Sequence, residues 1–275
     1  MDFDFDFDEL PVPFRMQPGL RKVDQVPLTP LIDNGPLFLE KQRVVQLGQS
    51  RLAVPGFDAG PALRSIATLA DKGGHCDSLA RPLELRFEED FAVLDAATGT
   101  LPWLCVCVPS HWAPEEKLGL HLAQVHAPVA DNSALQAASH QLIRLVTSGE
   151  SWQRSVCTVS PSGRFDQHPY RNSREPWPAH PADADPADFV ARLFLRVERQ
   201  SFIPILTPDG SPAGQAVFTI RVMLERLTDA VTTPAKASRL HDWLASMSPP
   251  VLDYKNLTAC REPVLAWLGR FASTH

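Results

Sequence analysis

The segment spanning residues 193–203, LFLRVERQSFI, holds the side chains whose types and spacing point most directly to chemistry. On a strand, successive side chains alternate between two faces, which places Arg199 among leucine, valine and isoleucine. A guanidinium group carries five hydrogen-bond donors and needs an anion in such surroundings. We expect that anion to be either a carboxylate of the protein itself or a bound carboxylate or phosphate.

The other face of the same predicted strand presents Arg196, Glu198 and Gln200 in a row between two phenylalanines. Two interpretations stay open for this row. The three residues are ordinary charges on a solvent-facing edge, or they line a binding site.

His126 is one candidate for a ligand role, on a rigid support. It lies in QVHAPV, between a predicted helix and a proline that fixes the backbone after it. His111, His121 and His140 compete with it, and a hydrogen-bonded structural role is the alternative for each. The five-residue gap from His121 to His126 does not bring two imidazoles onto one helical face, so a zinc pair is not favoured.

Composition narrows the class of protein. The chain has 275 residues, 44% of them hydrophobic and 21% charged, with a net charge of −6. Such a charge does not favour nucleic acid as a partner, because phosphate binding requires an excess of clustered Lys and Arg. We expect no membrane segment and a reducing cytoplasmic location, since no apolar run approaches about 20 residues and the five cysteines form no CxxC pair. The motifs GxGxxG, GxxxxGK[ST] and GxSxG are absent from the sequence.

Hydrophobic periodicity and the positions of Gly and Pro predict the elements that must position these residues. The predicted strands lie within 83–108, 152–159, 189–206 and 216–227, with a hairpin turn at 97–100. The predicted helices cover 37–46, 60–73, about 110–125, 132–147, 235–247 and 260–271. We therefore predict an α+β fold with a PAS-like antiparallel sheet of about five strands and helices on one side. Residues 1–60 would form an extended N-terminal arm, 61–230 the PAS-like domain and 231–275 a C-terminal helical extension.

The first residues, MDFDFDFDEL, alternate aspartate and phenylalanine. An extended segment with this pattern has one acidic and one aromatic face, which suits a docking arm. The alternative is a frayed tail, and we expect the tail, because chain termini are poorly ordered unless something holds them.

Three blocks of the sequence resemble the haem-dependent oxidative N-demethylase family. They are PFRMQPGL around Phe14, PSHWAPEEKLGLHLAQVHAPV at 109–129, and LRVERQSFIPIL with AVFTIRV within 195–222. The resemblance implies a PAS-like haem b pocket in which a small secondary amine, such as dimethylamine, is oxidised with O2 and formaldehyde is released. It also implies separate reductase subunits, which bring electrons from NADPH through flavin and an iron–sulfur centre.

The same resemblance implies roles for individual residues. His126 would be the axial ligand of the haem iron, with His140 as the alternative. Lys117, Arg196 and Arg199 would contact the haem, the two arginines through its propionates, and Glu198 would lie near the substrate as a catalytic group.

The chain also departs from the family pattern. Val156 and Cys157 stand where Asn and Trp are expected. A non-catalytic PAS-like sensor, or an interaction subunit that has lost haem chemistry, is therefore the alternative function.

Overall fold

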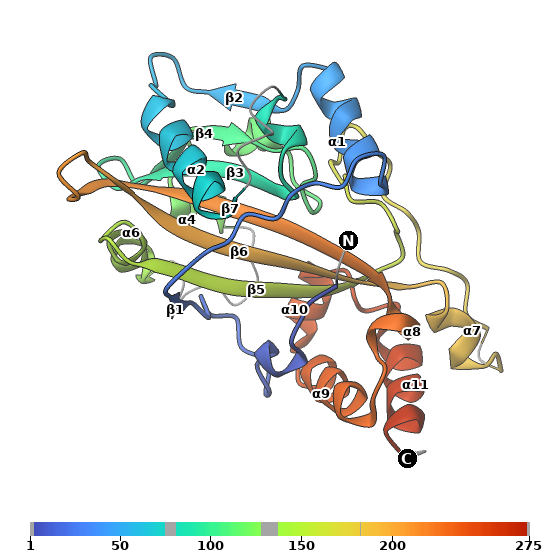
Figure 1. Cartoon of the computed structure of the whole chain (residues 1–275). Coiled ribbons are helices and arrows are strands. Elements are labelled where there is room, and N and C mark those ends of the chain that lie inside the picture. Colours follow the sequence, from blue (N-terminus) through green and yellow to red (C-terminus); the bar gives the residue numbers. More distant parts are fainter. Residues whose placement is uncertain (1–2, 75–80, 128–136, 182, 274–275) are drawn as a thin grey trace.

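One antiparallel sheet organises the chain. The computed structural model describes residues 3–74, 81–127, 137–181 and 183–273. Seven strands lie in the order β1-β5-β6-β7-β3-β4-β2, and each neighbouring pair is antiparallel (Figure 1). Their bounds are Arg21–Val23 (β1), Arg51–Ala53 (β2), Glu89–Asp95 (β3), Thr100–Cys105 (β4), Ser151–Ser160 (β5), Phe194–Leu206 (β6) and Pro212–Arg226 (β7). The predicted α+β class with an antiparallel sheet is confirmed.

The predicted number of about five strands was wrong. The two additional strands, β1 and β2, come from the first 60 residues and close the two edges of the sheet. Each has only three residues, which is too short to produce a recognisable period of two. Part of the segment that we predicted as an extended arm therefore belongs to the sheet, while the PAS-like architecture and the domain boundaries stay predictions.

Helices cover both faces of the sheet, so the predicted placement on one side was also wrong. Helix α2 (Gly60–Lys72) packs on the face that carries Ile203 and Val217. Helices α4 (Leu122–Val125) and α6 (Ser139–Val146) pack on the face that carries Phe202 and Phe218. Because Phe202 and Ile203 are consecutive on β6, their side chains point in opposite directions.

The other helices are short or lie toward the ends of the chain. They are α1 (Pro36–Gln46), α3 (Pro114–Lys117), α7 (Pro186–Val190), α8 (Leu227–Ala230), α9 (Pro234–Ala245), α10 (Pro249–Tyr254) and α11 (Arg261–Ser273), together with the 3-10 turns η1 (Phe7–Glu9) and η3 (Leu83–Leu85). Helices α9, α10 and α11 form a hydrophobic cluster with β5, β6 and β7 at one end of the sheet (Figure 1). No helix in the described ranges combines the length and the apolar composition that crossing a bilayer requires.

The helix predicted over 110–125 is divided into α3 and α4. Gly119 lies between them with a φ of +72°, a left-handed conformation that glycine adopts without strain. His121 then begins α4 as its N-cap, and its Nδ1 accepts a hydrogen bond from the amide of Ala123 at 3.2 Å. The second predicted helix begins at 132, outside the described residues, and its described part is α6.

The N-terminal segment is docked, so the expected frayed tail was wrong. The rings of Phe5 and Phe7 are only 6% and 4% exposed and join the cluster formed by the C-terminal helices. Just before Phe5, the Asp4 carboxylate lies 2.9 Å from Arg199 Nη1 and 3.0 Å from Arg221 Nη1. These two arginines face each other directly on β6 and β7, so a carboxylate from the arm relieves their repulsion.

The pH dependence of stability should report this contact. Burial alone raises the pKa of Asp4, but the hydrogen bond and charge of Arg199 and the charge of Arg221 outweigh it and lower the pKa below 3.8. A lowered pKa means that the stabilisation is complete above about pH 4 and is lost as the pH falls through the folded-state value.

We therefore expect Asp4→Asn to reduce the free energy of unfolding at pH 7 by about 1 kcal/mol or less, because half of the side chain is exposed. Urea unfolding of both proteins from pH 7 to pH 2 measures the difference between their free energies of unfolding. This difference should shrink toward zero as the pH falls. A difference that stays constant across this range would contradict the contact.

Candidate functional site

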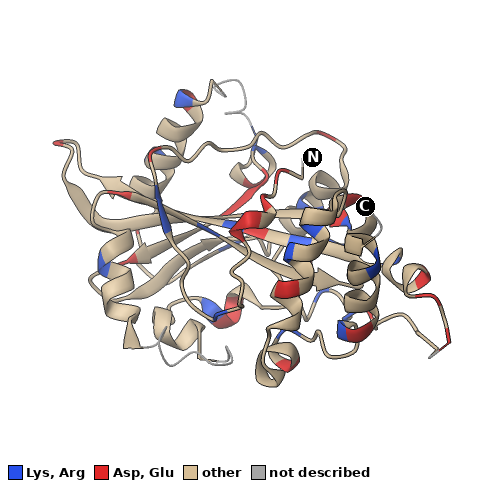
Figure 2. Ribbon diagram, turned by 90° about the horizontal axis from the view of Figure 1, so that it is seen from below, with Lys and Arg blue, Asp and Glu red and all other residues tan. Residues whose placement is uncertain are grey.

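Buried polar residues mark the candidate site better than surface charge does. Acidic and basic residues are interspersed over the ribbon in Figure 2. On β5 and β6, however, the register pairs Arg154 with Gln200 and Thr158 with Arg196, while Val156 lies opposite Glu198. Every second residue shares a face, so these polar side chains form one cluster on the face that carries Phe202. The predicted row of Arg196, Glu198 and Gln200 therefore shares its face with Arg154 of β5.

Glu198 is held by neutral donors. The hydroxyl of Ser110 donates to Oε1, and Gln200 Nε2 donates to Oε2 at 2.7 Å. Gln200 Oε1 in turn accepts a hydrogen bond from Arg154 Nε at 2.7 Å. The carboxylate is therefore fixed in orientation without a direct ion pair to either arginine of the cluster.

Arg196 is almost completely enclosed, with 1% of the residue exposed. Its Nε donates to Ser110 Oγ at 2.7 Å, and Nη1 donates to the carbonyl of Arg164 at 3.1 Å. Its Nη2 donates to the carbonyls of Val108 and Phe165 at 3.2 and 2.9 Å. Burial lowers the pKa of this guanidinium to about 10, although nearby carboxylates, Glu198 first, oppose the shift. Protein acceptors thus engage all three nitrogens, and the propionate contact that we predicted for Arg196 stays a prediction.

Arg199 lies on the other face of β6, as the alternation predicts. Its Nη1 donates to the Asp4 carboxylate and its Nη2 donates to the Asp4 carbonyl at 2.8 Å. Of the two anions that we considered for Arg199, the structure contains the internal carboxylate. Its predicted contact with a haem propionate would have to occur on the face opposite Glu198.

His126 borders the polar cluster from the C-terminal end of α4. Its Nδ1 lies 2.8 Å from the carbonyl oxygen of Leu122, and because a carbonyl can only accept, Nδ1 carries the proton. Burial first, and then the charges of Arg154 and Lys117, lower the pKa of the imidazole. His126 is therefore neutral near pH 7, with its remaining lone pair on Nε2.

His140 has different surroundings. It lies on the exposed side of α6, where its ring centroid is 5.4 Å from that of His121. Of the two histidines that we considered as ligands, His126 is the one that is half-buried beside the cluster. Which of them binds a metal stays a prediction.

Sequence reasoning named His111 only as a competitor of His126, and it missed Lys255. His111 has a φ of +60°, and burial, with the charges of Arg174 and Arg196, lowers the pKa of its ring to about 4 although the residue is exposed at the surface. Lys255 follows α10 and donates to the carbonyl of Cys157 on β5 at 3.1 Å. A left-handed histidine is the kind of backbone outlier that gathers at functional sites, but only the folded chain reveals it.

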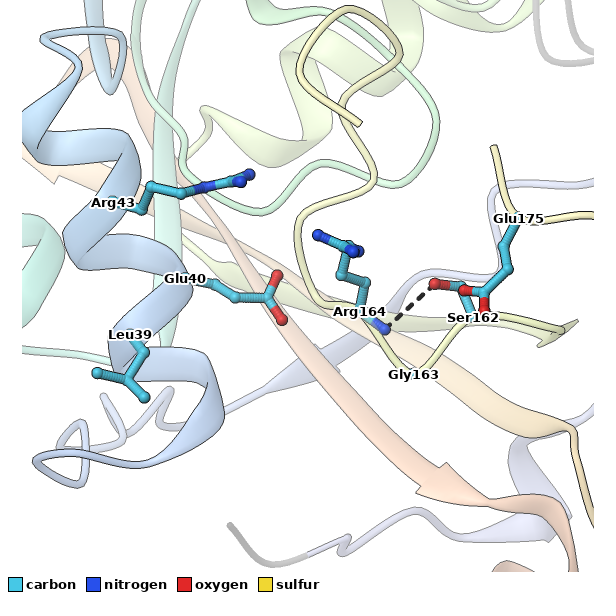
Figure 3. Close-up of a pocket in the computed structure, with 7 residues that line it drawn as sticks. All are labelled: Leu39, Glu40, Arg43, Ser162, Gly163, Arg164 and Glu175. Carbon is cyan, nitrogen blue, oxygen red and sulfur yellow. Dashed lines mark hydrogen bonds between the residues drawn. The ribbon is translucent and has the colours of Figure 1, made fainter. Parts of the chain in front are cut away.

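A wider hollow of about 400 Å³ lies nearby and is open to solvent. Figure 3 shows Glu40 and Arg43 extending from α1 toward the loop that carries Arg164. The Glu40 carboxylate accepts hydrogen bonds from the backbone amides of Phe165 and Asp166, and Arg43 lies 3.1 Å from the Asp166 carboxylate. These charged groups already serve to fix the loop, so we place the candidate site at the polar cluster instead.

A comparison with known protein families gives a match. The model described as haem-dependent oxidative N-demethylase, alpha subunit-like, covers residues 67–265. The matched region is more than half of the chain. It begins within α2, ends within α11, and contains the whole cluster around Glu198 and His126.

Proposed function

Because the chain belongs to the haem-dependent oxidative N-demethylase, alpha subunit-like family, we propose that it is the haem-binding subunit of an enzyme that demethylates a small secondary amine. In the balanced reaction, dimethylamine, O2, NADPH and a proton yield methylamine, formaldehyde, water and NADP+. One C–N bond breaks, and O2 is reduced at the expense of NADPH and the methyl carbon. A bound haem b would supply the activation of O2.

The cluster contains side chains of the kinds that would hold a haem group. Histidines that bind metals donate their other ring N–H to a carbonyl or carboxylate, and His126 donates its Nδ1–H to the Leu122 carbonyl. Haem also carries two propionates, which require cations. Arg154 and Lys117 are close enough to shift the pKa of His126, and Arg154 Nη2 makes no hydrogen bond within the described part of the chain. The hydrogen bond from His126 Nδ1 to the Leu122 carbonyl, on a histidine beside these cations, is the observation that carries the proposal.

Glu198 is the group that we assign to the substrate. A secondary amine is protonated near pH 7, and a carboxylate is the natural acceptor for its N–H groups. Ser110 and Gln200 orient the carboxylate, so its remaining lone pairs are directed rather than free to rotate. Glu198 would position the amine and hold the proton that leaves it before oxidation.

The electron supply is proposed from the family description, which names an alpha subunit and so implies at least one partner subunit. A separate reductase with flavin and an iron–sulfur centre would accept hydride from NADPH and pass on single electrons. Val156, which replaces the asparagine expected for the family, pairs with Glu198 and shares its face. This replacement favours a substrate other than dimethylamine.

Glu198→Gln should weaken substrate binding more than it affects folding. The amide keeps the size and the acceptor for Ser110 but removes the charge that holds the ammonium. We expect KM for dimethylamine to rise about tenfold, which corresponds to about 1.4 kcal/mol. Formaldehyde release by the haem-loaded chain with a reductase measures it.

Glu150→Gln is the matched control for this experiment, because Glu150 is exposed and, among the residues that the structure describes, pairs only with Lys22. This control variant should have the same KM for dimethylamine as the unmodified chain. An unchanged KM in Glu198→Gln would contradict the assignment. A haem-loaded chain that releases no formaldehyde at all would favour the sensor alternative.

A further inference from the structure

A small, partly enclosed hollow lies beside the polar cluster, at the outer edge of β5. It has a volume of about 30 Å³, which is room for one or two water-sized groups. The side chains that characterise it are those of His111, Thr158, Arg174, Trp177 and Lys255. A carboxylate head has two oxygens of this size.

Lys255 is the central cation of this hollow. Its ammonium group has three donors, of which one reaches the Cys157 carbonyl. The rings of Phe14 and Trp243 also lie close to this ammonium group, with centroids 5.9 and 6.0 Å from Nζ. Burial lowers its pKa, and no carboxylate of the described residues lies within 4 Å of it. An anion bound next to this buried ammonium group would therefore stabilise its charged form.

The rest of the lining favours an anion as well. Arg174 adds a second positive charge, and Thr158 adds a hydroxyl. His111 is neutral, so it neither adds charge nor competes for the ligand. Glu175 is the acidic residue in the lining, and it is exposed to solvent. Two positive charges and one negative charge therefore give the hollow a net charge of about +1, which one bound carboxylate would balance.

The hollow lies next to the assigned substrate residue. Lys255 donates to the carbonyl of Cys157, and the preceding residue, Val156, pairs with Glu198. Ser110, which precedes the lining residue His111, donates to Glu198, and the charge of Glu198 acts on Lys255 against the effect of burial on its pKa, so the two groups are close enough to interact. A molecule with an amine at one end and a carboxylate at the other could contact both.

We propose that this hollow binds the carboxylate of the substrate, and that the substrate class is a small N-methylated amino acid. The inference rests on the proposed function for the role of Glu198, but the hollow itself needs no haem. A haem propionate is the other source of a carboxylate at this place, and the experiment must separate the two.

Calorimetric titration of the full chain, without haem and after haem loading, tests the proposal. The probes are acetate, dimethylammonium and N-methylglycine. N-methylglycine should bind at least about tenfold more tightly than either of the others, since it uses both ends of the site. Haem loading should leave acetate binding in place.

Two variants and a control define the contacts. Lys255→Met and Arg174→Gln should weaken acetate and N-methylglycine about tenfold and leave dimethylammonium unchanged. Arg174 is exposed, so its replacement leaves the fold intact and keeps the test valid if Lys255→Met is poorly folded. Lys72→Met, which changes an exposed lysine at the end of α2, should behave as the unmodified chain.

Three results would overturn the proposal. They are an absence of acetate binding, unchanged N-methylglycine binding in both variants, and loss of acetate and N-methylglycine binding when haem is loaded. The last result would assign the hollow to a propionate. Failure of the proposed function is a separate result, namely a chain that takes up no haem while it still binds N-methylglycine.

Discussion

Haem should be lost from His126→Ala while the protein remains folded. The imidazole is neutral, and its Nδ1–H is fixed on the Leu122 carbonyl, so we propose Nε2 as the atom that would bind iron. Removing a protein ligand of the haem iron would leave the group held more weakly, by its propionates and by apolar contact. We expect the absorbance of the haem-loaded variant to fall to that of free haem, with loss of all formaldehyde release.

His140→Ala is the matched control, because it removes an imidazole of the same size from an exposed position on α6. This variant should retain haem with the unmodified spectrum. The reverse pattern, with haem lost from His140→Ala and kept in His126→Ala, would transfer the axial role to His140. Circular dichroism of both variants separates loss of haem from loss of the fold.

Lys41→Met should produce the largest loss of stability that we expect from a single change. Lys41 is fully buried in α1, where Nζ donates to the carbonyls of Phe87 and Glu89 at 3.0 and 2.8 Å. It also lies 3.0 Å from Asp90 Oδ1, in an ionic contact that is poorly aligned as a hydrogen bond. Burial opposes its charge, but Asp90 outweighs this effect, so the pKa of Lys41 is raised. Removing one partner of a buried ion pair costs about 3–5 kcal/mol, because the other charge is left uncompensated.

Urea unfolding at pH 7 measures that loss, and Lys72→Met, at an exposed position, should differ from the unmodified chain by no more than about 0.5 kcal/mol. The double variant Lys41→Met/Asp90→Asn should recover part of the stability, since it removes the unpaired charge. A loss below about 1 kcal/mol in the single variant would contradict the ionic role of Lys41.

The helices with clear end signals were predicted well from sequence. Helix α2 was expected over 60–73 and runs from Gly60 to Lys72, and α9 and α11 lie within two residues of their predicted bounds. Helix α10 was not predicted, because its first two residues are prolines. Proline is tolerated in the first turn of a helix, where its missing N–H is not needed.

The alternation of side chains between the two faces of a strand was the most informative pattern at the candidate site. It predicted Arg196, Glu198 and Gln200 on one face of β6 and Arg199 on the other, and the register with β5 and β7 confirms this. The identity of each partner could not be predicted in the same way. Asp4 reaches Arg199 across 195 positions of sequence, and no local pattern encodes such a contact.

The N-terminal arm illustrates the same limit. The alternation of aspartate and phenylalanine correctly described two chemically distinct faces, but terminal position favoured a frayed tail. The structure buries Phe5 and Phe7 and places Asp4 between two facing arginines. Whether such a segment docks depends on the surface that the rest of the chain offers, which the alternation itself does not contain.

The absorbance spectrum of the purified full chain after haem loading tests the central claim most directly. We predict a Soret band distinct from that of free haem, at one haem per chain, and a shift of this band when an amine substrate is added. A chain that takes up no haem, with a spectrum equal to the sum of protein and free haem, would contradict the account.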